Sequence, residues 1–169
     1  KITDTSTGTN SYSNLIMYNY GELENLIFKN INIDSPKENY VGIIGANYGL
    51  KINNITLDNI NIKGRETVGG FISYPYNRED IRYSNINASN VTILAERGIV
   101  GGIFGNMPNH HNFQTTTNIS IKDSNITSTA AGVSYVGGIS GLGDCNYCLV
   151  DNVEVTGARH VGGMTGYQR

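Results

Sequence analysis

The residues of this chain that could do chemistry begin with a pair of cysteines. Cys145 and Cys148 form a C-x-x-C motif, a spacing found in redox-active dithiols and in half of a structural zinc site. A structural zinc ion takes about four ligands, but the sequence contains no second cysteine pair, and His160 is the only other potential ligand nearby. Cys148 also occupies the first apolar position of a repeated phrase. We therefore expect a structural role, as buried thiols or as a local disulfide across the turn.

A pair of histidines is the second candidate. His110 and His111 are adjacent and lie in the longest insertion of the chain, between Asn109 and Asn112. Adjacent residues of a strand point to opposite sides, so joint chelation of one metal ion is awkward. We expect a solvated loop, and we treat the two histidines as candidate partner-binding residues.

Carboxylates are the third candidate, because glycosidases and lyases built on β-helices need acids that converge on one face. Glu79 and Asp80 are the only adjacent acidic pair. The remaining acids considered are scattered along the chain: Asp34, Asp58, Glu96, Asp123, Asp151 and Glu154. We expect this chain to have no catalytic residue, to bind no metal ion or cofactor, and not to be an enzyme by itself.

Two tyrosines complete the candidates. In the segment Tyr74-Pro75-Tyr76, the two rings could form an aromatic platform for a sugar ring. The alternative is a proline-stiffened loop that covers the edge of the core. We retain Tyr74 and Tyr76, together with His110 and His111, as the candidate partner-binding residues.

A repeat positions all of these residues. The phrase Val-Gly-Gly-Ile-Phe-Gly begins at Val100, related phrases begin at Val68, Val136 and Val161, and a looser copy begins at Val41. Successive valines are 27, 32, 36 and 25 residues apart. Recurrence at such a period is typical of solenoids and repeat arrays. No stretch has the apolar spacing of a helical repeat, so a helical solenoid is excluded.

A second repeated phrase precedes the glycine phrase and alternates apolar with polar residues, which indicates half-buried strands. Its copies are residues 26–33, 55–62, 86–93 and 148–155. Apolar residues stand at positions one, three, six and eight, so the alternation slips by one residue at an asparagine. Because such a slip reverses the buried face of a straight strand, the chain must bend or bulge there.

Asparagine suits this corner because it tolerates left-handed backbone angles. Identical asparagines can also stack from coil to coil through their side-chain amides. A further copy of the phrase, near residues 119–121, carries two extra residues before its asparagine. We therefore expect one corner in each coil, formed by Asn30, Asn59, Asn90, Asn125 and Asn152.

Two short strands hinged at asparagine, with the glycine phrase as a third side, form one turn of about 30 residues. The sequence predicts an all-β fold, a single-stranded right-handed parallel β-helix (β-solenoid) of about five to six coils of ~25–36 residues. Residues 1–14 are expected to be a polar lead-in and residues 15–169 the solenoid domain. Because the chain begins and ends inside its own repeat, we expect a fragment of a longer protein.

Composition excludes several functional classes. The chain has 12 basic and 14 acidic residues with no run of either sign, so we expect neither nucleic-acid binding nor a basic membrane-surface helix. The apolar stretches are far shorter than a bilayer span, and no membrane insertion is expected. Abundant Asn and Gly with no Trp favour a β-rich extracellular protein. We expect the fragment to be monomeric.

The phrase Val-Gly-Gly-apolar-x-Gly resembles the GLUG repeat, and the strand phrase with its asparagine resembles the repeats found with it. Residues 23–33 and the Val41 phrase are similar to the N-terminal repeats of bacterial IgA-specific zinc metallopeptidases; such repeats also occur in surface adhesins. The resemblance covers nearly the whole chain and implies a secreted or wall-anchored bacterial surface protein with a β-solenoid region. Those peptidases carry zinc in a His-Glu-x-x-His motif, which this sequence lacks.

The sequence therefore favours a non-catalytic β-solenoid module of a secreted or cell-surface, wall-associated bacterial protein. Such a module would serve as a rigid spacer and as a surface for a host protein or glycan. Two alternatives stay open: the substrate-capturing region of a zinc metallopeptidase, and a polysaccharide lyase or hydrolase on a β-helix. The last would need clustered carboxylates and a basic residue on one face, which the sequence does not show.

Overall fold

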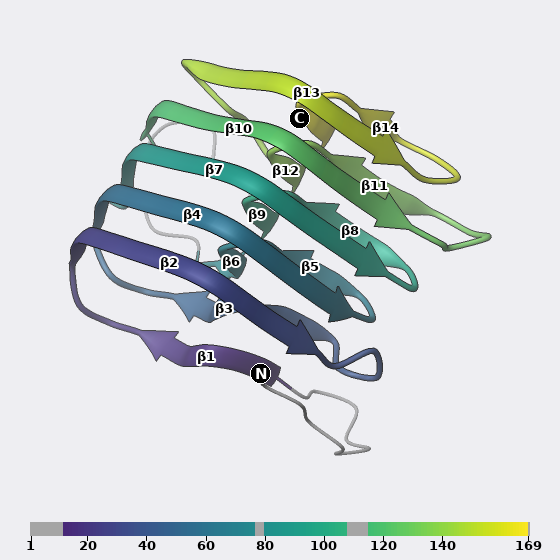
Figure 1. Cartoon of the computed structure of the whole chain (residues 1–169), viewed down its shortest axis with the longest axis horizontal. Helices are drawn as coiled ribbons and strands as arrows, with labels where there is room; N and C mark the ends of the chain where they lie inside the picture. Colours follow the sequence, from purple (N-terminus) through teal and green to yellow (C-terminus); the bar gives the residue numbers. More distant parts are fainter. Residues whose placement is uncertain (1–11, 77–79, 108–114, 169) are drawn as a thin grey trace.

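The structure is a computed structural model that describes residues 12–76, 80–107 and 115–168. Over these residues the secondary structure consists of fifteen β strands and no helix. All strand pairs are parallel. The strands stack as a β-solenoid of about five turns, which confirms the predicted fold. Figure 1 shows the coils rising in chain order from β1 to β14.

One long strand from each coil contributes to the first sheet. This sheet has the order β13-β10-β7-β4-β2, so neighbours in the sheet are successive coils of the chain (Figure 1). Equivalent apolar residues are in register, as in the column formed by Leu26, Ile55 and Ile86. The strands are β2 (Leu23–Asp34), β4 (Lys51–Gly64), β7 (Arg82–Ala95), β10 (Thr115–Ser128) and β13 (Cys148–Thr156).

The glycine phrases form the second sheet, as predicted. Val68, Val100, Val136 and Val161 occupy one register position. In the later coils this side is split into two short strands, which we call the first arm and the second arm of the coil. The first arm is formed by β5 (Thr67–Gly69), β8 (Gly98–Gly101), β11 (Ser134–Gly137) and β14 (Val161–Gly162). The second arm is formed by β6 (Ile72–Pro75), β9 (Phe104–Asn106), β12 (Ser140–Leu142) and β15 (Thr165–Tyr167).

The first two coils have a single strand on this side. β3 (Tyr40–Asn47) pairs with β5 through its first half and with β6 through its second half. β1 (Tyr12–Asn19) pairs with β3 on the other side. β1 therefore includes residues 12–14, which the sequence analysis assigned to the lead-in, whereas residues 1–11 lie outside the described residues.

Glycine is required where the two arms and successive coils approach each other. A Cβ atom at Gly70, Gly102 or Gly138 would overlap the carbonyl oxygen of the equivalent glycine one coil further on. A Cβ at Gly141 in β12 would meet the backbone nitrogen of Val100 in β8, so a second arm lies against the first arm of the preceding coil. Only glycine allows backbones to pack this closely.

The core lies between the two sheets and consists mostly of Ile and Val. Leu57, Ile60 and Ile62 are buried, with at most 1% of each exposed, whereas Asn61 is exposed and Asp58 is half-buried. This confirms the predicted register, including the slip at Asn59. The buried apolar residues form one continuous cluster that runs from Ile33 to Ile139.

The predicted asparagine corner is present, and its residues adopt the left-handed conformation. The φ angles are 57° at Asn30, 56° at Asn59, 55° at Asn90 and 49° at Asn152. In the fourth coil the prediction was wrong, because the corner residue is Asp123, with φ of 49°. Asn125 instead pairs with Thr92, in the extended segment beyond the corner.

The misassignment has a physical cause at Ser124. This serine occupies the inward position that Val153 holds in the next coil, so the apolar pattern is interrupted there. Ser124 is buried, and its hydroxyl donates a hydrogen bond to Lys122 O (2.6 Å) and accepts one from Val91 N (3.0 Å). A satisfied hydroxyl can replace an apolar side chain at modest cost, and no extra residues are inserted.

Each coil has a further left-handed corner, which the sequence analysis missed. Because it precedes the predicted corner by five residues, we call it the first corner of the coil; it is formed by Asn25, Asn54, Asn85, Asn118 and Tyr147, with φ between 53° and 56°. In β4 the inward residues are therefore spaced by three, two, three and two: Ile52, Ile55, Leu57, Ile60 and Ile62. Each interval of three contains one corner asparagine.

The glycine stacking makes a prediction about stability. Gly138→Ala should destabilise the protein by about 1–3 kcal/mol, the usual cost of overpacking, because its Cβ would overlap Gly163 O. Gly163→Ala is the matched control: it has the same position in the phrase, but a Cβ there meets no atom within 4 Å. Unfolding in urea measures both variants, and equal losses of stability would contradict the stacking.

Candidate functional site

Seven tyrosines of the first three coils form one connected group of rings on the glycine side. We call this group the tyrosine surface: Tyr12, Tyr18, Tyr20, Tyr40, Tyr48, Tyr74 and Tyr76. The coil register aligns them, because Tyr12 pairs with Tyr40, and Tyr18 and Tyr74 both pair with Ala46. Tyr20, Tyr48 and Tyr76 lie two residues after Tyr18, Ala46 and Tyr74, respectively.

Rings from successive coils stack in columns. The ring centroids of Tyr20 and Tyr48 are 4.9 Å apart with an interplanar angle of 14°, and those of Tyr48 and Tyr76 are 4.5 Å apart at 32°. Tyr12 and Tyr40 stack at 4.8 Å and 16°. Stacking covers the facing surfaces of these rings. A ligand would therefore meet mainly ring edges, hydroxyl groups and the outer face of Tyr20.

Contacts between columns join these stacks into one surface. Tyr12 and Tyr18 belong to the same strand, yet their centroids are 5.7 Å apart, so β1 bends sharply between them. Tyr40 meets Tyr74 edge to face at 6.1 Å, across the boundary between the first and second arms. The tyrosine surface thus covers the line along which the two arms meet.

The tyrosine surface is partly exposed to solvent. Tyr20 is 73% exposed, Tyr18 43% and Tyr76 41%. Burial, followed by the neighbouring phenols, raises the pKa of Tyr12 and of Tyr48 above the ordinary value. Both groups therefore remain protonated and can donate hydrogen bonds.

Two buried asparagines, Asn19 and Asn47, fix the turns that carry Tyr20 and Tyr48. Asn19 Nδ2 donates to Asn47 Oδ1 (2.7 Å) and to Gly21 O (2.9 Å), while Asn47 Nδ2 donates to Gly49 O (3.1 Å) and to the Tyr83 hydroxyl (3.0 Å). Burial raises the pKa of Tyr83. This network fixes the turns at Tyr20 and Tyr48, because each asparagine binds the carbonyl two residues further along.

The structure brings two of the four candidate partner-binding residues together. Tyr74 and Tyr76 both belong to the tyrosine surface, whose other five members the sequence analysis did not select. The recurrence of tyrosine beside Asn19 and Asn47 was the available signal, because it places rings at equal register. His110 and His111 lie outside the described residues.

Cys145 and Cys148 form a disulfide, one of the two structural roles expected from the sequence. Both are partly buried against the core, on either side of Tyr147. Tyr147 occupies the first corner of the fifth coil, where the other coils have asparagine. The disulfide therefore closes the chain around the corner that lacks an asparagine amide.

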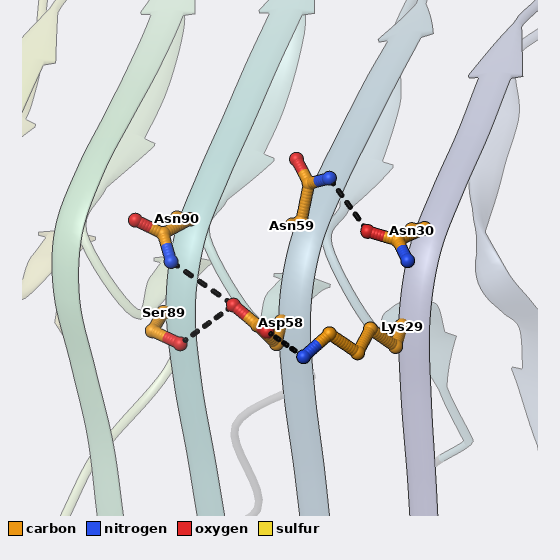
Figure 2. A network of polar contacts seen from close by, with 6 residues as sticks. All are labelled: Lys29, Asn30, Asp58, Asn59, Ser89 and Asn90. Carbon is orange, nitrogen blue, oxygen red and sulfur yellow. Dashed lines mark hydrogen bonds and ion pairs between the residues drawn. The ribbon is translucent and has the colours of Figure 1, made fainter.

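The outer face of the long strands carries a polar network around Asp58 (Figure 2). Its carboxylate lies 2.9 Å from Lys29 Nζ and accepts hydrogen bonds from Asn90 Nδ2 (3.0 Å) and Ser89 Oγ (3.3 Å). Beside it, Asn59 Nδ2 donates to Asn30 Oδ1 (2.7 Å). The bonds from Lys29 and Asn90 lower the pKa of Asp58 to about 2, so this acid is ionised and cannot act as a general acid near neutral pH.

Other acids lie on the same face in the later coils. Asp123 and Glu154 line a shallow polar hollow of about 290 Å³, together with Thr92, Ser124, Asn125 and Asn152. Asp123 accepts a hydrogen bond from Asn152 Nδ2 (2.8 Å), which continues the corner ladder. Among the described residues, no group of three or more His, Cys, Asp or Glu side chains is placed to hold a metal ion.

In comparisons with protein-family models, with curated proteins and with solved structures, nothing matches this chain. The resemblance to GLUG repeats therefore stays a prediction. Over the described part of the chain, no helix has the length and apolar character needed to span a bilayer.

The environment of Asp58 predicts a difference in acid stability. Its folded-state pKa of about 2 lies below the ordinary 3.8. The ionised carboxylate therefore stabilises the fold above about pH 4, and this contribution disappears as the pH falls towards 2. Asp58→Asn should lose less stability than wild type over this interval, as measured by the free energy of unfolding between pH 2 and 6. Asp151→Asn, at an equivalent but exposed position, is the control; identical profiles for wild type and Asp58→Asn would contradict the prediction.

Proposed function

We propose that this β-solenoid is a non-catalytic module of a secreted or cell-surface bacterial protein. It acts as a rigid spacer and presents the tyrosine surface to a host protein or glycan. The observation that carries the proposal is the continuous group of seven tyrosines, with Tyr18, Tyr20 and Tyr76 exposed on a regular scaffold.

The spacer role is supported by the way the coils are joined. Each coil bonds to the next through both sheets and through side-chain ladders such as Asn54 to Asn25 and Asn118 to Asn85. A stack of this kind grows by about 4.8 Å per coil, and each repeat is held by its contacts with the neighbouring repeats. The module therefore holds whatever lies on either side of it at a fixed separation.

The binding role is supported by the chemistry of tyrosine. Tyrosine provides a large, rigid contact area with a polar end, at low cost in conformational entropy, and is enriched in binding surfaces. The rings here are fixed further by stacking and by the buried network of Asn19 and Asn47. A partner would therefore meet a surface that is already ordered, which reduces the entropic cost of association.

The proposed location and the absence of catalysis rest on separate observations. A disulfide between Cys145 and Cys148 is expected to persist in an oxidising environment, such as the outside of a cell. The resemblance to bacterial surface repeats points to the same location. Asp58 forms an ion pair with Lys29, which favours a structural role for this acid.

The binding role is tested by replacing exposed tyrosines. Tyr20→Ala with Tyr76→Ala should weaken binding by at least about tenfold, because aromatic contacts dominate such surfaces. The measurement is the dissociation constant for each ligand found by screening glycans and purified host surface proteins. Tyr147→Ala is the matched control, because Tyr147 is 85% exposed but lies at the opposite end of the solenoid. Equal weakening by the control, or unchanged binding by the double variant, would contradict the proposal.

A further inference from the structure

We propose that the column Tyr20–Tyr48–Tyr76 is a site of oxidative tyrosine cross-linking. A one-electron oxidant, such as a haem peroxidase with hydrogen peroxide, would join neighbouring rings as dityrosine and fix the first coils to one another covalently. This inference concerns a modification of the chain and does not depend on the proposed binding function.

Ring geometry is the first argument. Two tyrosyl radicals couple through ring carbons next to the hydroxyl-bearing carbon, so the rings must be in contact when both are oxidised. Tyr48 lies 4.9 Å from Tyr20 and 4.5 Å from Tyr76 between ring centroids. These rings come from successive coils, whose register the sheets fix. Coupling therefore needs no encounter between mobile side chains, which is the kind of preorganisation that accelerates a reaction.

Access to the oxidant is the second argument. Tyr20 is 73% exposed and Tyr76 is 41% exposed, so an electron can be removed from either end of the column. Tyr48 lies between them and also contacts Tyr18 at 6.3 Å. A radical formed at any of these rings therefore has a phenol as its immediate neighbour.

The reaction balances with hydrogen peroxide as the oxidant. Each of two phenols loses one electron and one proton, which breaks two O–H bonds and gives two phenoxyl radicals. A carbon–carbon bond then forms between ring carbons beside the oxygens. The hydrogen atom on each of those carbons moves to the oxygen, which restores both phenols. The two electrons and two protons released reduce one hydrogen peroxide to two water molecules.

Tyr147 provides an internal comparison. It is the most exposed of these tyrosines, at 85%, yet within the described part of the chain it contacts no other ring. An oxidised Tyr147 can couple only with a second molecule. Dilution therefore separates the two reactions, because coupling within the column does not depend on protein concentration.

The test treats the full chain, at low concentration, with peroxidase and limiting hydrogen peroxide. We expect monomeric protein with dityrosine fluorescence, and a digest in which the Tyr48 peptide is linked to that of Tyr20 or Tyr76 with the loss of two hydrogen atoms. Tyr48→Phe retains a ring in the column but has no phenol, so the yield of dityrosine that links the Tyr20, Tyr48 and Tyr76 peptides to one another should fall by at least about tenfold. Tyr147→Phe should leave that yield unchanged.

Three results would overturn the proposal: no intramolecular dityrosine in wild type, an undiminished yield in Tyr48→Phe, or linkage chiefly at other tyrosines. Circular dichroism establishes that each variant is folded. Should Tyr48→Phe fail to fold, Tyr20→Phe with Tyr76→Phe removes both stacked partners while leaving Tyr48 in place. That double variant must also lose the cross-link at Tyr48 for the proposal to stand.

Discussion

The stack depends on a backbone constraint: along the side of the long strands, the chain passes through the left-handed region twice per coil. The corners lie five residues apart, as at Asn54 and Asn59. Between and beyond them the chain is extended, so each corner adds one residue to the interval between inward side chains. This keeps Ile52, Leu57 and Ile62 on the same side of the sheet. Asparagine meets the requirement twice over, because it tolerates positive φ and its amide can bond to the neighbouring coil.

The tyrosine surface is a consequence of the same regularity on the opposite side of the solenoid. Glycine stacking brings the two arms of each coil together, and parallel register then places equivalent residues above one another. A tyrosine repeated at one position becomes a column of rings, such as Tyr20, Tyr48 and Tyr76. The fold and the tyrosine surface therefore have the same origin. The repeat that closes the core also orders the rings, and the buried Asn19–Asn47 contact connects the core with the turns that carry the rings.

Sequence alone predicted the parts of this structure that depend on local pattern. Repeated valines fixed the coil register, and the slip at Asn59 fixed the buried face. The first corner, at Asn54, could have been predicted from the same pattern, because Ile52 and Ile55 are three residues apart. Asn54 was missed because it lies just before the repeated strand phrase, which begins at Ile55. The columns of tyrosine rings could have been predicted from the recurrence of tyrosine beside Asn19 and Asn47, but their union into one surface depends on the fold-back of the arms, which no pattern in the sequence specifies. Tyr74 and Tyr76 were found from their own spacing, whereas Tyr40 becomes part of the surface only because Tyr74 meets it across the arms.

The most direct test of the left-handed corner compares Gly and Ala at Asn59. At an ordinary strand position Gly is less stable than Ala by roughly 0.5–1 kcal/mol. In the left-handed region the order reverses, because a Cβ costs about 1–2 kcal/mol there. The free energy of unfolding should therefore be higher for Asn59→Gly than for Asn59→Ala, while the same pair at the extended, exposed Asn61 should show the ordinary order. A less stable Asn59→Gly would contradict the account.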